Sequence, residues 1–114
     1  MRTFISAKIH DVRVTSKSLA YSGSVTVCRE LLAAVDIVPY ERVEVVNLEN
    51  GARWATYAIP GKPGVFELNG GGARLGEVGD RCIVMAFRQG GEFGGAQVVY
   101  CDEQNSVARQ GVYP

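Results

Sequence analysis

The chain has 114 residues, 46% of them hydrophobic and 21% charged, and its 12 basic and 12 acidic side chains leave no formal net charge. This length predicts a single domain, because two cores of half the size would bury too little surface to be stable. The composition argues against disorder, and the zero net charge argues against a nucleic-acid or anionic-membrane partner. Zero net charge also favours association with other copies.

The first part of the chain predicts strands around one short helix. Residues 4–15 alternate and are rich in β-branched side chains, which predicts a long strand with a bulge near His10. A polar, turn-like stretch leads to a short strand at 24–27. Residues 28–35 fit one or two helical turns, which end before Pro39.

The remainder predicts further strands separated by Gly- and Pro-rich turns. Residues 42–48 and 52–59 flank Asn50-Gly51, which is typical of a hairpin turn of the primed kind. Asn69-Gly70-Gly71-Gly72 and 89–95 are expected to be loops, and the tail after Asn105 is expected to fray. The other strands are expected at 65–68, 81–87 and 97–101. Many short strands and one convincing helix predict a mainly β fold, a small closed β-barrel.

Cysteine usage and the N-terminus indicate a cytoplasmic protein. Cys28, Cys82 and Cys101 are far apart, and the single histidine cannot complete a zinc site with them. We therefore expect no metal and buried free thiols in a reducing compartment. Lys8 interrupts the apolar N-terminal stretch, so no signal peptide is expected, and no window is long and apolar enough to span a membrane.

Taken one at a time, the candidate catalytic residues are weak signals. His10 could join a serine triad, but no GxSxG motif accompanies it. The loop at 69–72 could present backbone N–H groups to a carboxylate or phosphate, although it lacks the P-loop lysine and fits a tight turn equally well. Lys8 and Arg53 could bind an anion, yet such residues more often lie on a solvated surface.

Taken together, several motifs occur in a specific order and spacing. They are Lys8-Ile9-His10, YSGSVTV at 21–27, ELLAAVDI at 30–37, NGARWATYAI at 50–59, LNGGGA at 68–73 and VGDRCIVMAF at 78–87. This set resembles the pyruvoyl-dependent aspartate 1-decarboxylase family, from Met1 to about Val107. The resemblance implies a small six-stranded double-psi β-barrel with one or two short helices, one domain over 1–114, that assembles as a homotetramer.

The resemblance also implies a self-made cofactor. The backbone would be cut between Gly23 and Ser24 into a β chain (1–23) and an α chain (24–114). Ser24 Oγ would attack the carbonyl carbon of Gly23 to give an ester, a step that needs strain and oxyanion donors. β-Elimination would then leave dehydroalanine, which hydrolyses to a pyruvoyl group. Cleavage is expected to be either spontaneous or assisted by a maturation factor.

The implied reaction is decarboxylation of L-aspartate to β-alanine, which feeds pantothenate and coenzyme A biosynthesis. The pyruvoyl carbonyl would form a Schiff base with the substrate amine and accept electrons as CO₂ leaves. Tyr57 would protonate the α-carbon, since a phenol is protonated near neutral pH. Thr56 would bind substrate and assist self-cleavage. Lys8 and Arg53 would hold the substrate carboxylate, which suits a guanidinium fork.

The remaining family positions line the same pocket. Substrate would also be bound by Asn69, Gly70, Gly71 and Gly72, with His10 and Tyr21 nearby. Family members usually carry Asn-Gly-Ala-Ala-Ala in this loop, so the glycines here widen the pocket. That difference keeps a second interpretation open, a pyruvoyl decarboxylase of another amino acid. A third is an unprocessed barrel that acts as a binding or assembly subunit.

Overall fold

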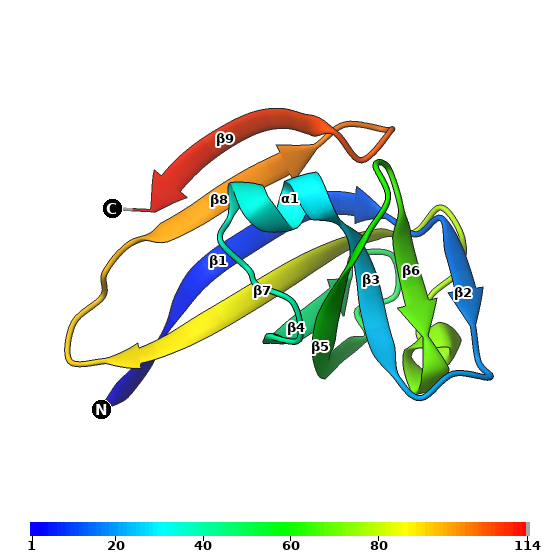
Figure 1. The fold of residues 1–114 in the computed structure, drawn as a ribbon, viewed down its shortest axis with the longest axis horizontal. Coiled ribbons are helices and arrows are strands. Elements are labelled where there is room, and N and C mark those ends of the chain that lie inside the picture. Colours follow the sequence, from blue (N-terminus) through cyan, green and yellow to red (C-terminus); the bar gives the residue numbers. More distant parts are fainter. Residues whose placement is uncertain (114) are drawn as a thin grey trace.

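The computed structural model describes residues 1–113, which form a mainly β protein as predicted (Figure 1). Its elements in chain order are β1 (Arg2–Arg13), β2 (Ser16–Ser18), β3 (Ser24–Cys28), α1 (Arg29–Ala34), β4 (Arg42–Asn47), β5 (Arg53–Gly61), β6 (Phe66–Asn69), the 3₁₀ helix η1 (Gly70–Arg74), β7 (Arg81–Gly90), β8 (Ala96–Cys101) and β9 (Val107–Tyr113). The expected positions of the first strands and of the helix are confirmed within a few residues.

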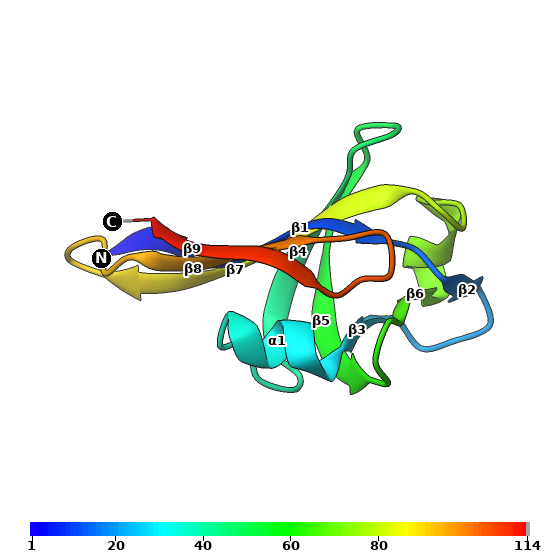
Figure 2. The same cartoon turned by 90° about the horizontal axis from the view of Figure 1, so that it is seen from above.

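The strands are hydrogen-bonded in the order β2-β6-β3-β5-β4-β7-β1-β8-β9, so chain neighbours are rarely sheet neighbours. Parallel pairs (β2 with β6, β3 with β5, β1 with β8) are mixed with antiparallel ones. β1, β7, β8 and β9 extend to one side, where both ends of the chain lie, while β2, β3 and β6 occupy the opposite side (Figure 2). This small, mixed, strongly crossed arrangement is compatible with the expected double-psi barrel.

The bulge expected near His10 is present in β1. The register of β1 against β7 shifts between His10 and Val12, and Asp11 between them has φ 66°. A second shift lies between Ile5 and Ala7. Each extra residue bends β1 and increases its twist, and the strand pairs with β7 on one edge and with β8 on the other.

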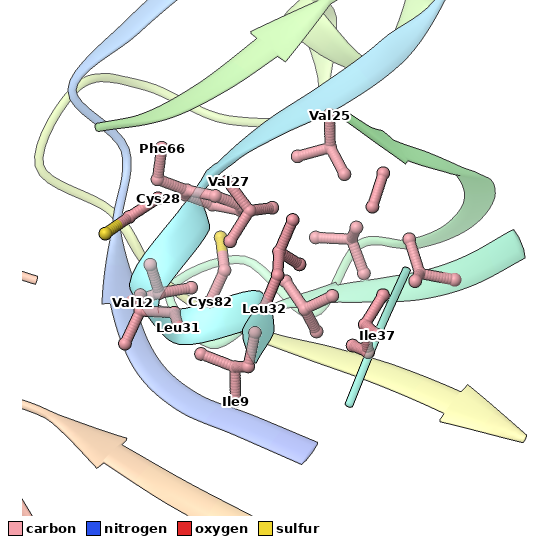
Figure 3. Packing of buried hydrophobic residues seen from close by; sticks show 14 of the residues in the cluster. Ile9, Val12, Val25, Val27, Cys28, Leu31, Leu32, Ile37, Phe66 and Cys82 are labelled. Atoms are coloured by element: carbon pink, nitrogen blue, oxygen red, sulfur yellow. The ribbon is translucent and has the colours of Figure 1, made fainter. Parts of the chain in front are cut away.

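One hydrophobic core lies between α1 and the strands (Figure 3). Leu31 and Leu32 from α1 point into it and meet residues such as Ile9, Val27 and Phe66. The alternating pattern of β4 explains its place there, since Val43 and Val45 are fully buried. α1 is too short to be stable alone, so this packing holds it in place.

The three cysteines are free thiols, as expected. Cys28 and Cys82 are buried in the core, and Cys101 is half-buried beside it. Burial raises the pKa of Cys82 to about 12 and that of Cys101 to about 12. Their sulfur atoms are therefore protonated packing groups near neutral pH.

The turn at Asn50-Gly51 differs from the prediction. Gly51 has φ 76°, but Asn50 lies outside the left-handed region, so the turn is not of the primed two-residue type. Instead, the side chain of Asn50 accepts a hydrogen bond from the Ala52 N–H at 2.8 Å, and Asn47 does the same for Glu49. These Asx turns close a longer loop between β4 and β5.

Two further expectations are corrected. The segment after Asn69 is a 3₁₀ helix, η1, rather than an irregular loop. The tail does not fray: β9 pairs with β8, from Ala96 opposite Tyr113 to Cys101 opposite Val107. The buried Asn105 fixes the connection, since its side chain accepts from the N–H of Arg13 and donates to the carbonyls of Arg13 and Gly64.

Across residues 1–113 no helix is long and apolar enough to cross a membrane. The same residues hold no group of three or more His, Cys, Asp or Glu side chains that could bind a metal ion.

Candidate active site

Ser24 is a buried serine at the start of β3, with 3% of its surface exposed. β3 runs antiparallel to β6, and the register sets Ser24 opposite Asn69. The Asn69 amide donates one hydrogen bond to Ser24 Oγ at 3.1 Å and another to Thr26 Oγ1 at 2.9 Å. Ser24 and Thr26 share one face of the strand because side chains alternate, so one asparagine fixes both hydroxyls.

The backbone immediately before Ser24 is in a conformation that glycine favours. Gly23 has φ 107°, and a Cβ atom there would meet nothing within 4 Å. The requirement for glycine at this position therefore comes from the backbone torsion and not from crowding. Tyr21, two residues earlier, is half-exposed, with 50% of its surface accessible.

Gly70 brings the loop after β6 into direct contact with this backbone. It has φ 73°, and a Cβ atom there would lie 2.7 Å from Gly23 Cα, 2.8 Å from Gly23 N and 2.9 Å from the Tyr21 carbonyl oxygen. Only glycine fits without moving the backbone of 21–23. Asn69 and Gly70 thus contact the two residues of the Gly23–Ser24 bond, one each.

The next two glycines differ from one another. A Cβ atom at Gly72 would lie 2.9 Å from Nε1 of Trp54, whereas one at Gly71 would meet nothing within 4 Å. The space that a methyl group would take at Gly72 is therefore filled by the indole. The pocket is not widened at Gly72, which weakens the expectation drawn from the two glycines.

Thr56 and Tyr57 lie on β5, which runs parallel to β3. The register pairs Val25 with Ala58, the residues that follow Ser24 and Tyr57 respectively. Both Thr56 and Tyr57 are partly buried. The backbone of both residues therefore lies beside the start of β3, although their side chains, as neighbours on one strand, point to opposite faces of the sheet.

Arg53 lies at the other end of β5 and is already paired. Its Nη2 and Nε donate to the same oxygen of Glu44, at 2.7 and 2.9 Å. It lines a pocket of about 470 Å³. The other residues that line this pocket are Thr3, Arg42, Val43, Glu44, Phe87, Arg88 and Gln89.

Lys8 and His10 lie on β1 and contact a different part of the molecule. Lys8 Nζ is 3.4 Å from the hydroxyl of Tyr113. The His10 ring packs on Tyr100 with 5.2 Å between centroids, and its Nδ1 is 3.1 Å from Asp11 Oδ1. Within residues 1–113 none of the hydrogen bonds, ion pairs or ring contacts of Lys8, His10 or Arg53 involves Ser24. Within a single chain, the structure therefore brings only some of the predicted site residues together.

Sequence reasoning missed three residues near the site. Thr26 was detectable in principle, because it lies two residues after Ser24 and so shares its face of the strand. Trp54 fills the space at Gly72, and Tyr40 packs its ring on that of Tyr57 with 6.0 Å between centroids. Neither of these contacts can be read from the local sequence, because the two residues of each contact lie in different segments of the chain.

Comparisons with known proteins identify the family to which the chain is similar. A family model described as aspartate decarboxylase matches residues 1–108. An aspartate 1-decarboxylase from Pyrobaculum islandicum is 52% identical over 76% of this chain and 72% of its own length. Two proteins with longer matches are an aspartate 1-decarboxylase from Acaryochloris marina, 47% identical over 93% of this chain and 86% of its own, and aspartate 1-decarboxylase 2 from Gloeobacter violaceus, 48% identical over 94% and 90%.

Proposed function

The chain belongs to the aspartate decarboxylase family, and we propose that it converts L-aspartate to β-alanine and CO₂ with a pyruvoyl group made from Ser24. The product would enter pantothenate and coenzyme A biosynthesis in the cytoplasm. The observation that carries the proposal is the buried Ser24, bonded to Asn69 and preceded by a glycine in the left-handed region.

The neighbours of Ser24 suit self-cleavage of the Gly23–Ser24 bond. The Asn69 amide donates to Oγ, which leaves that oxygen a free lone pair and fixes its direction. Gly23 has no Cβ to shield its carbonyl carbon from attack. The attack would form an ester between Ser24 Oγ and the Gly23 carbonyl and convert the Ser24 amide nitrogen to a free amine. β-Elimination would then release 1–23 as a carboxylate and leave dehydroalanine at position 24. Hydrolysis of dehydroalanine would release its nitrogen as ammonia and leave the pyruvoyl group.

The residues present fit the group that this reaction makes. Ser24 is buried and accepts a hydrogen bond from Asn69, the backbone of Gly70 packs on Gly23 beside it, and Ser24 forms no hydrogen bond with a charged side chain within residues 1–113. Once formed, the group would supply a carbonyl that condenses with the substrate amine and accepts electrons as CO₂ leaves. Tyr57 would hold a proton for the α-carbon of the substrate, and Thr56 would bind substrate beside it.

The substrate carboxylate would be held by Arg53 and Lys8, and this requires more than one copy of the chain. Within residues 1–113 neither residue forms a hydrogen bond or ion pair with Ser24, Asn69 or Gly70, whereas Arg53 borders a pocket with Arg42 and Arg88. We propose that the homotetramer completes each site by bringing Arg53 and Lys8 of one copy to Ser24 of another. Asn69, Gly70, Gly71 and Gly72 would contact substrate from the same copy as Ser24, with Tyr21 and His10 as pocket residues.

Intact mass under denaturing conditions, before and after warming, tests the cleavage. We expect 1–23 and 24–114, the latter lighter by one ammonia than a chain with an N-terminal serine, and reactive toward a carbonyl reagent. Ser24→Ala is expected to stay whole. A wild-type chain that stays whole in pure form but is cut in cell extract would indicate a maturation factor. One that is never cut would contradict the proposal and favour an unprocessed binding subunit.

Release of CO₂ from a panel of amino acids tests the substrate. We expect L-aspartate to be consumed and β-alanine to form in equal amount. A processed protein that ignores aspartate and acts on another amino acid would overturn the substrate but keep the pyruvoyl mechanism.

A further inference from the structure

Tyr40 has an unusual backbone conformation for its residue type. Four non-glycine residues among 1–113 have positive φ: Asp11, Asp36, Asn105 and Tyr40 at 69°. Short polar side chains such as Asp and Asn tolerate this region because they bond locally to the backbone, but a bulky aromatic residue there is a genuine outlier. Strain of this kind persists only where the surroundings impose it.

Backbone hydrogen bonds to β5 hold Tyr40 in place. Its N–H donates to the carbonyl of Ala58 at 2.7 Å, and the Ala58 N–H donates to the carbonyl of Glu41 at 3.0 Å. Both bonds use only the backbone of residues 40 and 41, and any residue but proline could donate the first, so they explain the backbone but not the choice of tyrosine. Burial does not explain it either, because 74% of Tyr40 is exposed.

The contact specific to the Tyr40 side chain is with Tyr57. The two rings lie 6.0 Å apart between centroids, with 30° between their planes. Tyr57 itself is only partly buried on β5, and the Tyr40 ring packs against it. The backbone bonds to Ala58 fix Tyr40 relative to the residue next to Tyr57.

We propose that Tyr40 is a positioning residue for the Tyr57 phenol. This inference rests on the proposed role of Tyr57 as proton donor. By stacking on one face of the ring, Tyr40 narrows the orientations of Tyr57 and keeps its hydroxyl directed toward the substrate carbon. A proton donor that is displaced by a fraction of a hydrogen-bond length slows the chemical step. Substrate binding is unaffected, because it uses other residues.

Three variants separate this role from a structural one. Tyr40→Asn and Tyr40→Gly remove the ring but accept the left-handed backbone, so both are expected to fold and to melt at or above the wild-type temperature. Tyr40→Phe keeps the ring and lacks only the hydroxyl. Val38→Ala removes another exposed apolar side chain from the same loop and is the matched control.

Each protein would be processed, confirmed by intact mass, and assayed with L-aspartate. We expect Tyr40→Asn and Tyr40→Gly to lower kcat about tenfold with KM unchanged, while Tyr40→Phe and Val38→Ala keep the wild-type kcat. Unchanged kcat in Tyr40→Asn, an effect on KM alone, or an equal loss in Tyr40→Phe would overturn the proposal. If the processed wild type does not act on aspartate, both the proposed substrate and the role of Tyr40 are wrong. If the wild type is active and Tyr40→Asn is equally active, only the role of Tyr40 is wrong.

Discussion

The backbone at Gly70 touches the backbone at Gly23: a Cβ atom added to Gly70 would lie 2.7 Å from Gly23 Cα. The loop proposed to bind substrate is therefore in direct backbone contact with the residue whose peptide bond is proposed to be cut. A change in η1 that moves Gly70 also moves the carbonyl that Ser24 would attack.

We predict that Gly70→Ala blocks or strongly slows self-cleavage. Its methyl group would meet the Gly23 Cα and N at under 3 Å, and its φ of 73° is unfavourable for alanine, so the backbone at 21–23 must shift. The strain is expected to cost about 1–3 kcal/mol of stability. Intact mass against time measures the cleavage, and thermal unfolding of the precursor measures the cost.

Gly71→Ala is the matched control for this prediction. It adds the same methyl group one residue later, where nothing lies within 4 Å and φ is not positive. Cleavage at the wild-type rate is expected. Equal rates in Gly70→Ala and Gly71→Ala would mean that contact with Gly23 has no part in maturation.

Asn69 is predicted to act on cleavage through Ser24 and on stability through Thr26 as well. Asn69→Ala removes both hydrogen bonds and leaves two buried hydroxyls without this donor, which is expected to cost about 1–3 kcal/mol and to slow cleavage. Thr26→Val keeps the shape of the side chain and removes only the second bond. We expect it to lower the melting temperature while the cleavage rate is retained. Slow cleavage in Thr26→Val would show that the two effects are not separable.

Gly72 is predicted to be required for full stability because the Trp54 indole occupies the space beside it. In Gly72→Ala the new methyl group would lie 2.9 Å from Trp54 Nε1, so the half-buried indole must move. We expect a loss of about 1–2 kcal/mol in unfolding free energy. Replacing the indole as well, in Gly72→Ala/Trp54→Phe, should recover most of that loss. Failure of the second substitution to help would show that the backbone of η1, not the indole, resists the methyl group.

The sequence predicted those features whose cause is local. Alternating, β-branched residues placed β1, and the interrupted pattern near His10 placed the bulge in it. Family motifs brought Ser24, Asn69 and Gly70 into one hypothesis, and in the structure Asn69 bonds to Ser24 while Gly70 packs on Gly23. Hydrophobic periodicity and motif spacing are carried by neighbouring residues, so they can be read without knowing the fold.

The features it did not predict depend on distant partners. β9 is exposed at every residue, so no alternation marks it, and it pairs with β8 across a connection fixed by Asn105. The stack of Tyr40 on Tyr57 joins a loop to a strand, and the Trp54 contact joins β5 to η1. The separation of Arg53 and Lys8 from Ser24 likewise follows from topology, which motif order does not encode.

The buried thiols predict a loss of stability at alkaline pH. The folded state raises the pKa of Cys82 to about 12 and that of Cys101 to about 12, chiefly by burial, from an ordinary value of 9.0. At pH values between 9.0 and about 12 these thiols lose their protons in the unfolded chain but keep them in the folded chain. The free energy of unfolding therefore falls as pH rises above about 9. We expect the melting temperature to fall from pH 8.5 to 11, and to fall less in Cys82→Ala/Cys101→Ala. Parallel curves would contradict the assignment.

Asp80 predicts a pH effect of opposite sign. The pKa of this carboxyl is lowered mainly by a hydrogen bond from the Asn47 side chain at 2.8 Å and also by the backbone N–H of Glu77. Its stabilising contribution is therefore complete above its ordinary value of 3.8 and is lost as pH falls through the lower folded-state value. At pH 7, Asp80→Asn should unfold more easily than wild type by up to about 1 kcal/mol, because the carboxyl is partly solvated.

Near pH 2 the difference between wild type and Asp80→Asn should shrink, since both side chains are then neutral. Glu92→Gln, which removes an exposed carboxyl from the loop between β7 and β8, is the control and should track wild type at both pH values. Denaturant titrations at pH 7 and pH 2 measure the effect. A difference of equal size at both values would mean that the charge of Asp80 contributes nothing to the stability of the loop before β7. The hydrogen bond from the fully buried Asn47 would then act equally on the neutral acid.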